Sequence, residues 1–254
     1  MKILILGGTT QASILAQRLA GEGRHDVLLS FAGRTANPLL PPVPCRVGGF
    51  GGVDGLIRFL GENSIGVLVD ATHPFAAQMS LYAVHAVRAI NLPLLRLQRP
   101  AWEKCEGDLW IEVADMHAAA RALGTTARRV FLPIGKLEIG AFSIAPQHDY
   151  LIRAVDSFTP SPELDRACVI TARGPFAVED EVRLMNDARI ETVVSKNSGA
   201  GATYAKIVAA RRLGIPVVMV ARPALSEAQT VATVEAARDW VENQHAGLSV
   251  LRGE

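Results

Sequence analysis

The stretch Ile3-Leu4-Ile5-Leu6-Gly7-Gly8-Thr9-Thr10-Gln11-Ala12 decides the class of fold. Its four apolar residues predict a buried strand, its two glycines a tight turn, and the residues after them a helix. In this setting a pyrophosphate binds at the N-terminus of the helix. Gly7 and Gly8 let backbone N–H groups approach phosphate, and Thr9 and Thr10 add hydroxyl donors. The pattern reads GGTxxA instead of GxGxxG, with Ala12 in place of the third glycine, so a tight turn without a ligand is the alternative.

Short apolar runs alternate with amphipathic stretches along almost the whole chain, which indicates parallel α/β sheets. We predict an α/β fold of two Rossmann-like lobes, each with a mainly parallel sheet flanked by helices, and an active-site cleft between them. Arg99-Pro100-Ala101-Trp102 cannot easily continue a strand and marks the boundary. The predicted domains are therefore 1–98, which binds the dinucleotide, and 99–254. The predicted strands cover 2–6, 26–31, 45–47, 65–70, 93–97, 109–113, 129–133, 150–155, 169–171, 192–195 and 216–220.

Composition excludes several classes of protein. The 254 residues are 49% hydrophobic, 20% charged and only 6% aromatic, which argues against disorder and against aromatic platforms for nucleic acid. A formal net charge of +1 provides no general field for nucleic acid or anionic membranes, and no apolar run approaches the ~18 residues of a membrane span. Cys45, Cys105 and Cys168 show no CxxC spacing, which favours a reducing compartment. We expect a soluble cytoplasmic protein.

The end of the second strand indicates which dinucleotide binds. An NAD site normally carries an acidic residue there, ~20 positions after the glycine turn, to hold the ribose 2′-hydroxyl. Here the sequence reads Leu29-Ser30-Phe31-Ala32-Gly33-Arg34, which offers a hydroxyl and a planar cation and no carboxylate. Arg34 can bind a 2′-phosphate bidentately, which favours NADPH; the alternative is a solvated loop charge.

A third segment, Asp70-Ala71-Thr72-His73-Pro74-Phe75, follows the strand expected beside the first one, across the topological switch point. Its loop should therefore face the cofactor. Asp70 has two possible roles that the sequence leaves open: a catalytic carboxylate, or a brace that accepts backbone N–H groups. His73 has no second histidine or cysteine at ligand spacing, so we expect no metal site.

Cations follow several strands of the second half, in turns that contain glycine or proline. They are Lys136, Arg173, Lys196 and Arg222. Because strands of a parallel sheet share one carboxyl edge, these four positions predict a cationic rim for a ligand with many carboxylates. A single cation of this kind is more often a solvated loop residue. The segment 195–201 can add backbone N–H donors as an anion nest, or serve as a plain entry to the next helix.

Taken together, GGTxxA at 7–12, DATHPFA at 70–76, ARGPF at 172–176 and SKNSG at 195–199 resemble the precorrin-6A reductase family, from Met1 to about Trp240. The resemblance implies NADPH-dependent reduction of precorrin-6A to precorrin-6B in cobalamin biosynthesis. It implies a polycarboxylated tetrapyrrole as the partner of the second domain, and leaves neighbouring pathway enzymes as further candidates. Nucleic acid and membranes are not expected partners.

The resemblance also implies roles for individual residues. NADPH would be bound by Gly7, Gly8, Thr9, Thr10, Ser30, Gly33 and Arg34, with Thr72 and His73 lining its crevice. The tetrapyrrole would be bound by Lys136, Arg173, Lys196, Asn197 and Ser198. Lys196 is the first candidate for the proton donor, with Asp70 and His73 after it, and water as the alternative source.

Three other functions compete. A short-chain dehydrogenase needs a tyrosine and a lysine four residues apart, and Tyr82, Tyr150 and Tyr204 lack that lysine. A redox sensor would bind NADPH without turnover and would present an apolar face to a protein partner. The third is the same reductase acting on the cobalt-containing precursor.

Overall fold

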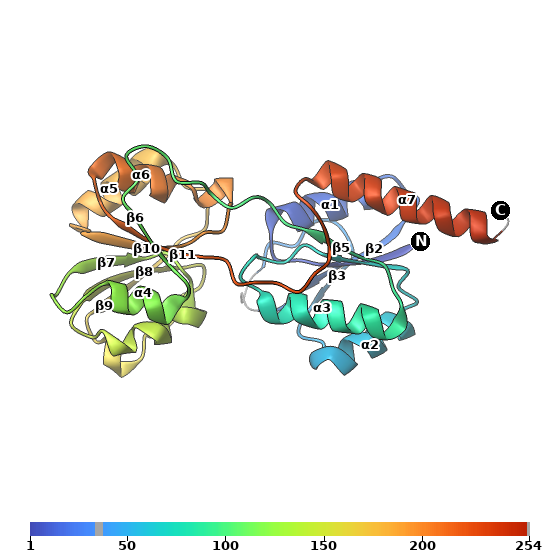
Figure 1. The fold of residues 1–254 in the computed structure, drawn as a ribbon, viewed down its shortest axis with the longest axis horizontal. Helices are drawn as coiled ribbons and strands as arrows, with labels where there is room; N and C mark the ends of the chain where they lie inside the picture. Colours follow the sequence, from blue (N-terminus) through green and yellow to red (C-terminus); the bar gives the residue numbers. More distant parts are fainter. Residues whose placement is uncertain (34–37, 253–254) are drawn as a thin grey trace. The chain divides into compact units, whose positions relative to one another are not determined.

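A computed structural model describes residues 1–33 and 38–252 of the chain and confirms the predicted α/β class. The chain forms two compact units, one made of Met1–Pro100 together with the chain from Ala224 onward, the other of Ala101–Pro223. Figure 1 shows a helix-covered sheet in each unit. In the described part of the chain, no helix has both the length and the apolar character needed to cross a bilayer.

The first unit contains one parallel sheet in the strand order of dinucleotide-binding folds. From one edge to the other the strands are β3 (Cys45–Val47), β2 (Asp26–Phe31), β1 (Lys2–Leu6), β4 (Val67–Asp70), β5 (Leu94–Leu97) and β12 (Gln229–Val231). In register, Leu6 lies opposite Ser30 on one side and opposite Asp70 on the other. The three sequence segments predicted to form the cofactor site therefore begin side by side at one edge.

Helices cover both faces of this sheet, which explains why its strands are continuously apolar. Ile3 and Ile5 of β1 pack with α1 (Thr10–Gly21) and α7 (Val234–Arg252) on one face. Leu4 and Leu6 pack on the other face with α2 (Gly52–Glu62) and α3 (Ala77–Ile90). All four strand side chains are at most 1% exposed, so β1 is the centre of the core.

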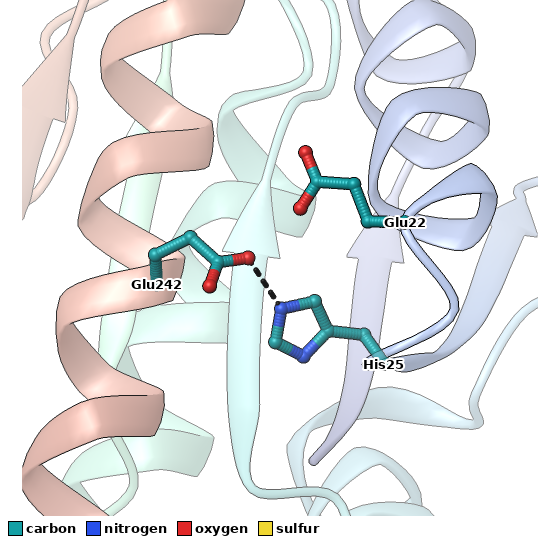
Figure 2. A group of neighbouring side chains, drawn as sticks. All are labelled: Glu22, His25 and Glu242. Carbon is teal, nitrogen blue, oxygen red and sulfur yellow. Dashed lines mark hydrogen bonds and ion pairs between the residues drawn. The ribbon is translucent and has the colours of Figure 1, made fainter.

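The end of the chain differs from the predicted domain boundary. We expected 99–254 as one domain, but the chain from Ala224 onward returns to the first unit. There β12 extends the sheet by pairing in parallel with β5, and α7 buries Val234, Ala237 and Val241 against α1 and the sheet. Figure 2 shows Glu242 of α7 hydrogen-bonded to His25, at 2.7 Å, beside Glu22 at the end of α1. Apolar packing and ion pairs together hold the segment in place.

The second unit also contains one parallel sheet. Its strands in spatial order are β6 (Trp110–Val113), β11 (Val217–Val220), β10 (Thr192–Lys196), β7 (Arg129–Leu132), β8 (Asp149–Ala154) and β9 (Ala167–Thr171). Its helices are α4 (Met116–Ala122), α5 (Val178–Asp187) and α6 (Ala205–Leu213), with 3-10 helices η1 (Lys136–Ile144), η2 (Pro162–Leu164) and η3 (Gly201–Thr203). The chain leaves β7 and β10 toward opposite edges, so the switch point of this sheet lies between them.

Candidate functional site

A cavity of about 410 Å³ opens at the carboxyl edge of the first sheet. The predicted cofactor residues Gly7, Gly8, Gly33, Thr72 and His73 all line it. Further parts of the wall come from the loop before α2 and from α3, which sequence reasoning did not single out. These residues include Gly49, Phe50, Gly51, Gly52, Gln78, Met79 and Tyr82. A cavity of this size at the switch point of such a sheet suits part of a dinucleotide.

The glycine turn has a steric cause. The Gly7 amide donates to the Ser30 carbonyl at 2.8 Å, and a Cβ on Gly7 would lie 2.8 Å from Leu29 Cδ1. Gly8 has a φ of 107°, a conformation that side chains disfavour. The two glycines line the cavity, and the chain continues from them directly into the first turn of α1. Its leading amides have no acceptor within the helix and favour an anion.

Thr9 has a different role from the one predicted. Its hydroxyl donates to the Ala71 carbonyl at 2.8 Å and accepts the Ala12 amide at 3.2 Å, so it caps α1 and ties the turn to the end of β4. The single hydroxyl proton of Thr9 is used in this bond within the chain, so the side chain cannot also donate it to a phosphate. Thr10, the first residue of α1, has an exposed side chain.

Ser30 is buried and belongs to a hydrogen-bonded group around Arg46 that the sequence did not reveal. Its Oγ accepts a hydrogen bond of 2.9 Å from Arg46 of β3. Arg46 also donates to the carbonyls of Gly48 and Gly49, both at 3.0 Å, and its guanidinium lies 4.0 Å from the centre of the Phe50 ring. Burial lowers the pKa of Arg46. The predicted phosphate ligand Arg34 lies outside the described residues.

Asp70 acts as a brace. Its carboxylate is 2% exposed and accepts four hydrogen bonds from three residues. Oδ1 accepts the amide and the hydroxyl of Thr72, at 3.2 and 2.7 Å, and Oδ2 accepts the Ser80 hydroxyl at 2.6 Å and Arg96 Nε at 3.4 Å. With its acceptor positions occupied, Asp70 fixes the loop after β4, and the catalytic role left open by the sequence is not favoured. The Thr72 hydroxyl is likewise directed to Asp70, not to a ligand.

Of the three predicted catalytic residues, Lys196, Asp70 and His73, it is His73 that lines this cavity. Its Nδ1 accepts the Phe75 amide at 3.2 Å. In the neutral imidazole the proton is therefore on Nε2, which makes that atom a donor. The ring lies 5.7 Å from the Phe75 ring, between centroids, which limits its rotation.

In the second unit, parallel pairing brings the predicted cations to one edge of the sheet. Lys136 follows β7, Arg173 follows β9, Lys196 ends β10 and Arg222 follows β11. Lys136 and Arg173 are exposed, whereas Lys196 and Arg222 are half-buried. The loops of Lys136 and Lys196 flank the switch point, where α/β proteins bind ligands. Lys196 Nζ also forms an ion pair with Glu138 of η1, a partner that the sequence did not indicate.

Asn197 and Ser198 make internal contacts in place of the predicted ligand contacts. The Asn197 side chain accepts the Trp102 amide at 2.7 Å and donates to the Trp102 carbonyl at 3.0 Å. Its own carbonyl accepts Arg222 Nε at 2.9 Å. The Ser198 hydroxyl is buried and accepts the Ala200 amide at 3.4 Å. These two residues shape the loop and fix the Trp102 backbone.

A buried charged cluster lies behind this rim, and sequence reasoning missed it. Arg153 and Glu181 are joined by two hydrogen bonds, the longer of 3.3 Å, and are 7% and 2% exposed. Lys206 of α6 is 4% exposed and donates to the Thr203 carbonyl at 2.8 Å. Burial, with the charges of Arg153 and Lys196, lowers the pKa of Lys206 to about 7, against the opposing effect of Glu181. Strong pKa perturbation of this kind is common at functional sites.

Metal-ligand side chains come together at one place among the described residues, namely Glu22, His25 and Glu242 (Figure 2). Arg24 already pairs with both carboxylates, at 2.7 Å to Glu22 and 2.9 Å to Glu242. The group lies at the end of α1 and beside α7, where it attaches the C-terminal helix. Its chemistry is that of an ion-pair network, and we assign it no metal.

Comparison with known proteins identifies one family. The model of the family described as precorrin-6x reductase CbiJ/CobK matches residues 2–242. A precorrin-6A reductase of Sinorhizobium sp is 50% identical, over 93% of this chain and 90% of its own length. The solved structure of CobK precorrin-6A reductase is 43% identical and covers 96% of this chain and 97% of its own, with a TM-score of 0.91. A cobalt-precorrin-6A reductase of Synechocystis sp. is 28% identical, over 87% of this chain and 88% of its own length.

The family model matches nearly the whole chain, and the fold with one parallel sheet in each unit agrees with the solved CobK structure. The chain belongs to the precorrin-6x reductase family.

Proposed function

We propose that this chain is an oxidoreductase that reduces precorrin-6A to precorrin-6B in cobalamin biosynthesis, with NADPH as the bound cofactor that supplies the hydride. The observation that carries the proposal is the cavity at the carboxyl edge of the first sheet, lined by the glycine turn and by the loop after β4. The family assignment supports the reaction, and the residues of the cavity fit a dinucleotide.

Backbone groups would hold the pyrophosphate. Gly7 and Gly8 line the cavity and lead into α1, whose first amides and dipole would favour a negative charge at this end of the helix. Thr9, through its bond to Ala71, keeps this turn fixed against β4. Gly33, and Thr72 through atoms other than its hydroxyl, would contact the ligand from the neighbouring strand ends.

The preference for NADPH rests on the charge at the end of β2. No carboxylate occurs among residues 29–34, and Arg46 places a second cation at Ser30. A carboxylate at this position would repel a 2′-phosphate, whereas cations attract it. Arg34 is therefore the proposed phosphate ligand, and Arg46 supports the loop at Gly48 and Gly49.

The carboxylate arms of the tetrapyrrole would bind at the rim of the second unit, on Lys136, Arg173 and Lys196. Reduction of a double bond by hydride also consumes one proton. Lys196 is the proposed donor; Glu138 orients its ammonium until a substrate carboxylate competes for it. His73 Nε2 is the alternative donor, and Asp70 acts as a positioning residue for the loop that carries His73.

A direct test follows the absorbance of NADPH while the purified protein is incubated with precorrin-6A. Oxidation of NADPH supports the reductase, whereas tight binding without oxidation supports a redox sensor. Supplying the cobalt-containing precursor in parallel separates the two substrates, and we expect the metal-free compound to be preferred. Arg34→Ala should weaken NADPH far more than NADH, and equal losses would refute the assignment of the 2′-phosphate.

A further inference from the structure

Lys206 is a buried ammonium at the carboxyl edge of the second sheet that the proposed reaction does not yet use. It is the second residue of α6 and follows the loop that begins with Lys196. Its Nζ donates to the Thr203 carbonyl at 2.8 Å and lies 5.0 Å from the centre of the Trp102 ring. Asn197 fixes the Trp102 backbone through two hydrogen bonds, so the indole is held as a cover over the ammonium.

The charged groups that face Lys206 nearly cancel. Arg153 of β8, Glu181 of α5 and Lys196 of β10 all act on it, and Glu138 of η1 neutralises Lys196. Arg153 already neutralises Glu181 through two hydrogen bonds, so the negative charge of Glu181 stabilises the Lys206 ammonium only in part. With Lys206 protonated there are three cations against two carboxylates, a net charge of +1; without its proton the cluster is neutral. A single proton on Lys206 therefore sets the net charge of this cluster, and with it the field that the cluster adds to the rim.

We propose that Lys206 is a further residue of the substrate site, which binds a proton when a polycarboxylated ligand occupies the rim and then holds that ligand by its charge. The inference rests on the proposed function, since that function places the carboxylates at Lys196. Lys206 acts across the Trp102 cover and through the field of Lys196, so it is a positioning residue and not a group that touches the reacting atoms.

The direction of the linkage follows from the burial of Lys206. A lysine with a pKa of about 7 is half deprotonated at neutral pH. A carboxylate that binds nearby favours the protonated form and raises this pKa, and by reciprocity the protonated protein binds the carboxylate more tightly. If the bound-state pKa lies well above 9, affinity falls about fivefold between pH 7 and pH 8, and tenfold for each further unit up to that pKa.

Two measurements test this. In protein labelled with ¹⁵N-lysine, the Nζ resonance of Lys206, assigned by its loss in Lys206→Arg, should titrate near pH 7 and shift to higher pH when precorrin-6A is added without reduced cofactor. Calorimetry in buffers of different ionisation enthalpy should show proton uptake on binding at pH 8. The fall in affinity with pH should be present in the wild type and absent in Lys206→Met and Lys206→Arg, since neither side chain exchanges a proton in this range.

Lys104→Met is the matched control, because it removes the same charge from an exposed position of the same unit and should leave the pH dependence intact. A Lys206 resonance that titrates above pH 9 in the free protein overturns the inference, and so does a pH dependence of affinity that persists in Lys206→Met. Failure of the proposed function has a different signature: precorrin-6A then neither binds to the wild type nor oxidises NADPH at pH 6.5.

Discussion

Two glycines of helix α2 should respond in opposite ways to the same substitution, Gly→Ala. Alanine stabilises a helix by about 1 kcal/mol relative to glycine. At Gly61 a new Cβ meets no atom within 4 Å, so Gly61→Ala should raise the free energy of unfolding by about 0.5–1 kcal/mol. At Gly55 a new Cβ would lie 2.8 Å from the carbonyl carbon of Phe50, and closer still to the carbonyl oxygen.

The clash at Gly55 involves backbone, so it cannot be relieved by a change of rotamer. Restoring an ordinary contact of 3.4 Å to the carbonyl carbon requires a displacement of at least 0.6 Å (3.4 minus 2.8), more for the oxygen, in the loop that carries Phe50. Overpacking of this kind costs about 1–3 kcal/mol. The free energies of unfolding of the two variants should therefore differ by roughly 1.5–4 kcal/mol, because the helix gain at Gly61 adds to the cost of the clash at Gly55.

Urea unfolding measures the difference in stability between the two variants, and NADPH fluorescence measures how tightly each variant binds the cofactor. Phe50 and its neighbouring glycines line the cavity, so Gly55→Ala should also weaken NADPH binding, whereas Gly61→Ala should not. Equal stability of the two variants would contradict the close approach of α2 to its own entry loop. Normal NADPH affinity in a destabilised Gly55→Ala would contradict the assignment of the cavity.

Further expectations concern the brace, the rim and the C-terminal helix. Asp70→Asn should lower the free energy of unfolding by about 3 kcal/mol in urea and weaken NADPH, because it breaks a buried ion pair; an unchanged midpoint would count against the brace. Lys196→Ala combined with Arg173→Ala should raise the KM for precorrin-6A steeply at low salt without changing NADPH affinity; unchanged kinetics would argue against the rim. Burial opposes the ionisation of Glu242, but the hydrogen bond from His25 and the charge of Arg24 outweigh it and lower the pKa of Glu242. Its contribution to stability should be present above the unfolded-state pKa and lost as pH falls through the lowered folded value, so Glu242→Gln should flatten the acid limb of a pH-stability curve measured by circular dichroism.

Much of the fold follows from the sequence because strand signals are local. β1, β2 and β3 have the predicted bounds. The apolar runs in β1 and β2 are typical of covered strands, whereas β3, with Arg46 at its centre, gives a weaker signal. The fate of the chain after Ala224 does not follow from any local signal. β12 is three residues long and begins with Gln229 and Thr230, so its pairing with β5 depends on tertiary contacts that have no periodicity to detect.

The candidate site was predictable in position and less so in chemistry. The order of a parallel sheet brings strand ends together, so Gly7, Gly33 and His73 could be grouped from spacing alone. The hydrogen-bond partner of each polar group could not be predicted in this way. The sequence offers the Thr9 hydroxyl as a ligand donor, but this hydroxyl donates to the Ala71 carbonyl. The Asn197 side-chain amide is likewise bonded to the Trp102 backbone.

The same limit explains the residues that were missed. Arg46 lies in a weak strand and becomes significant only because Ser30 and the Gly48 carbonyl accept from it. Lys206 occurs in an ordinary helix, where a lysine usually faces solvent. Only the packing of Trp102 and α5 around it reveals that its ammonium is buried.

Stopped-flow absorbance of the reduced nicotinamide, on mixing the NADPH-loaded protein with precorrin-6A, tests the central claim most directly. We predict that NADPH is consumed one for one with precorrin-6A, and that precorrin-6B is the product recovered. NADPH that stays bound and unoxidised in the presence of precorrin-6A would contradict the account.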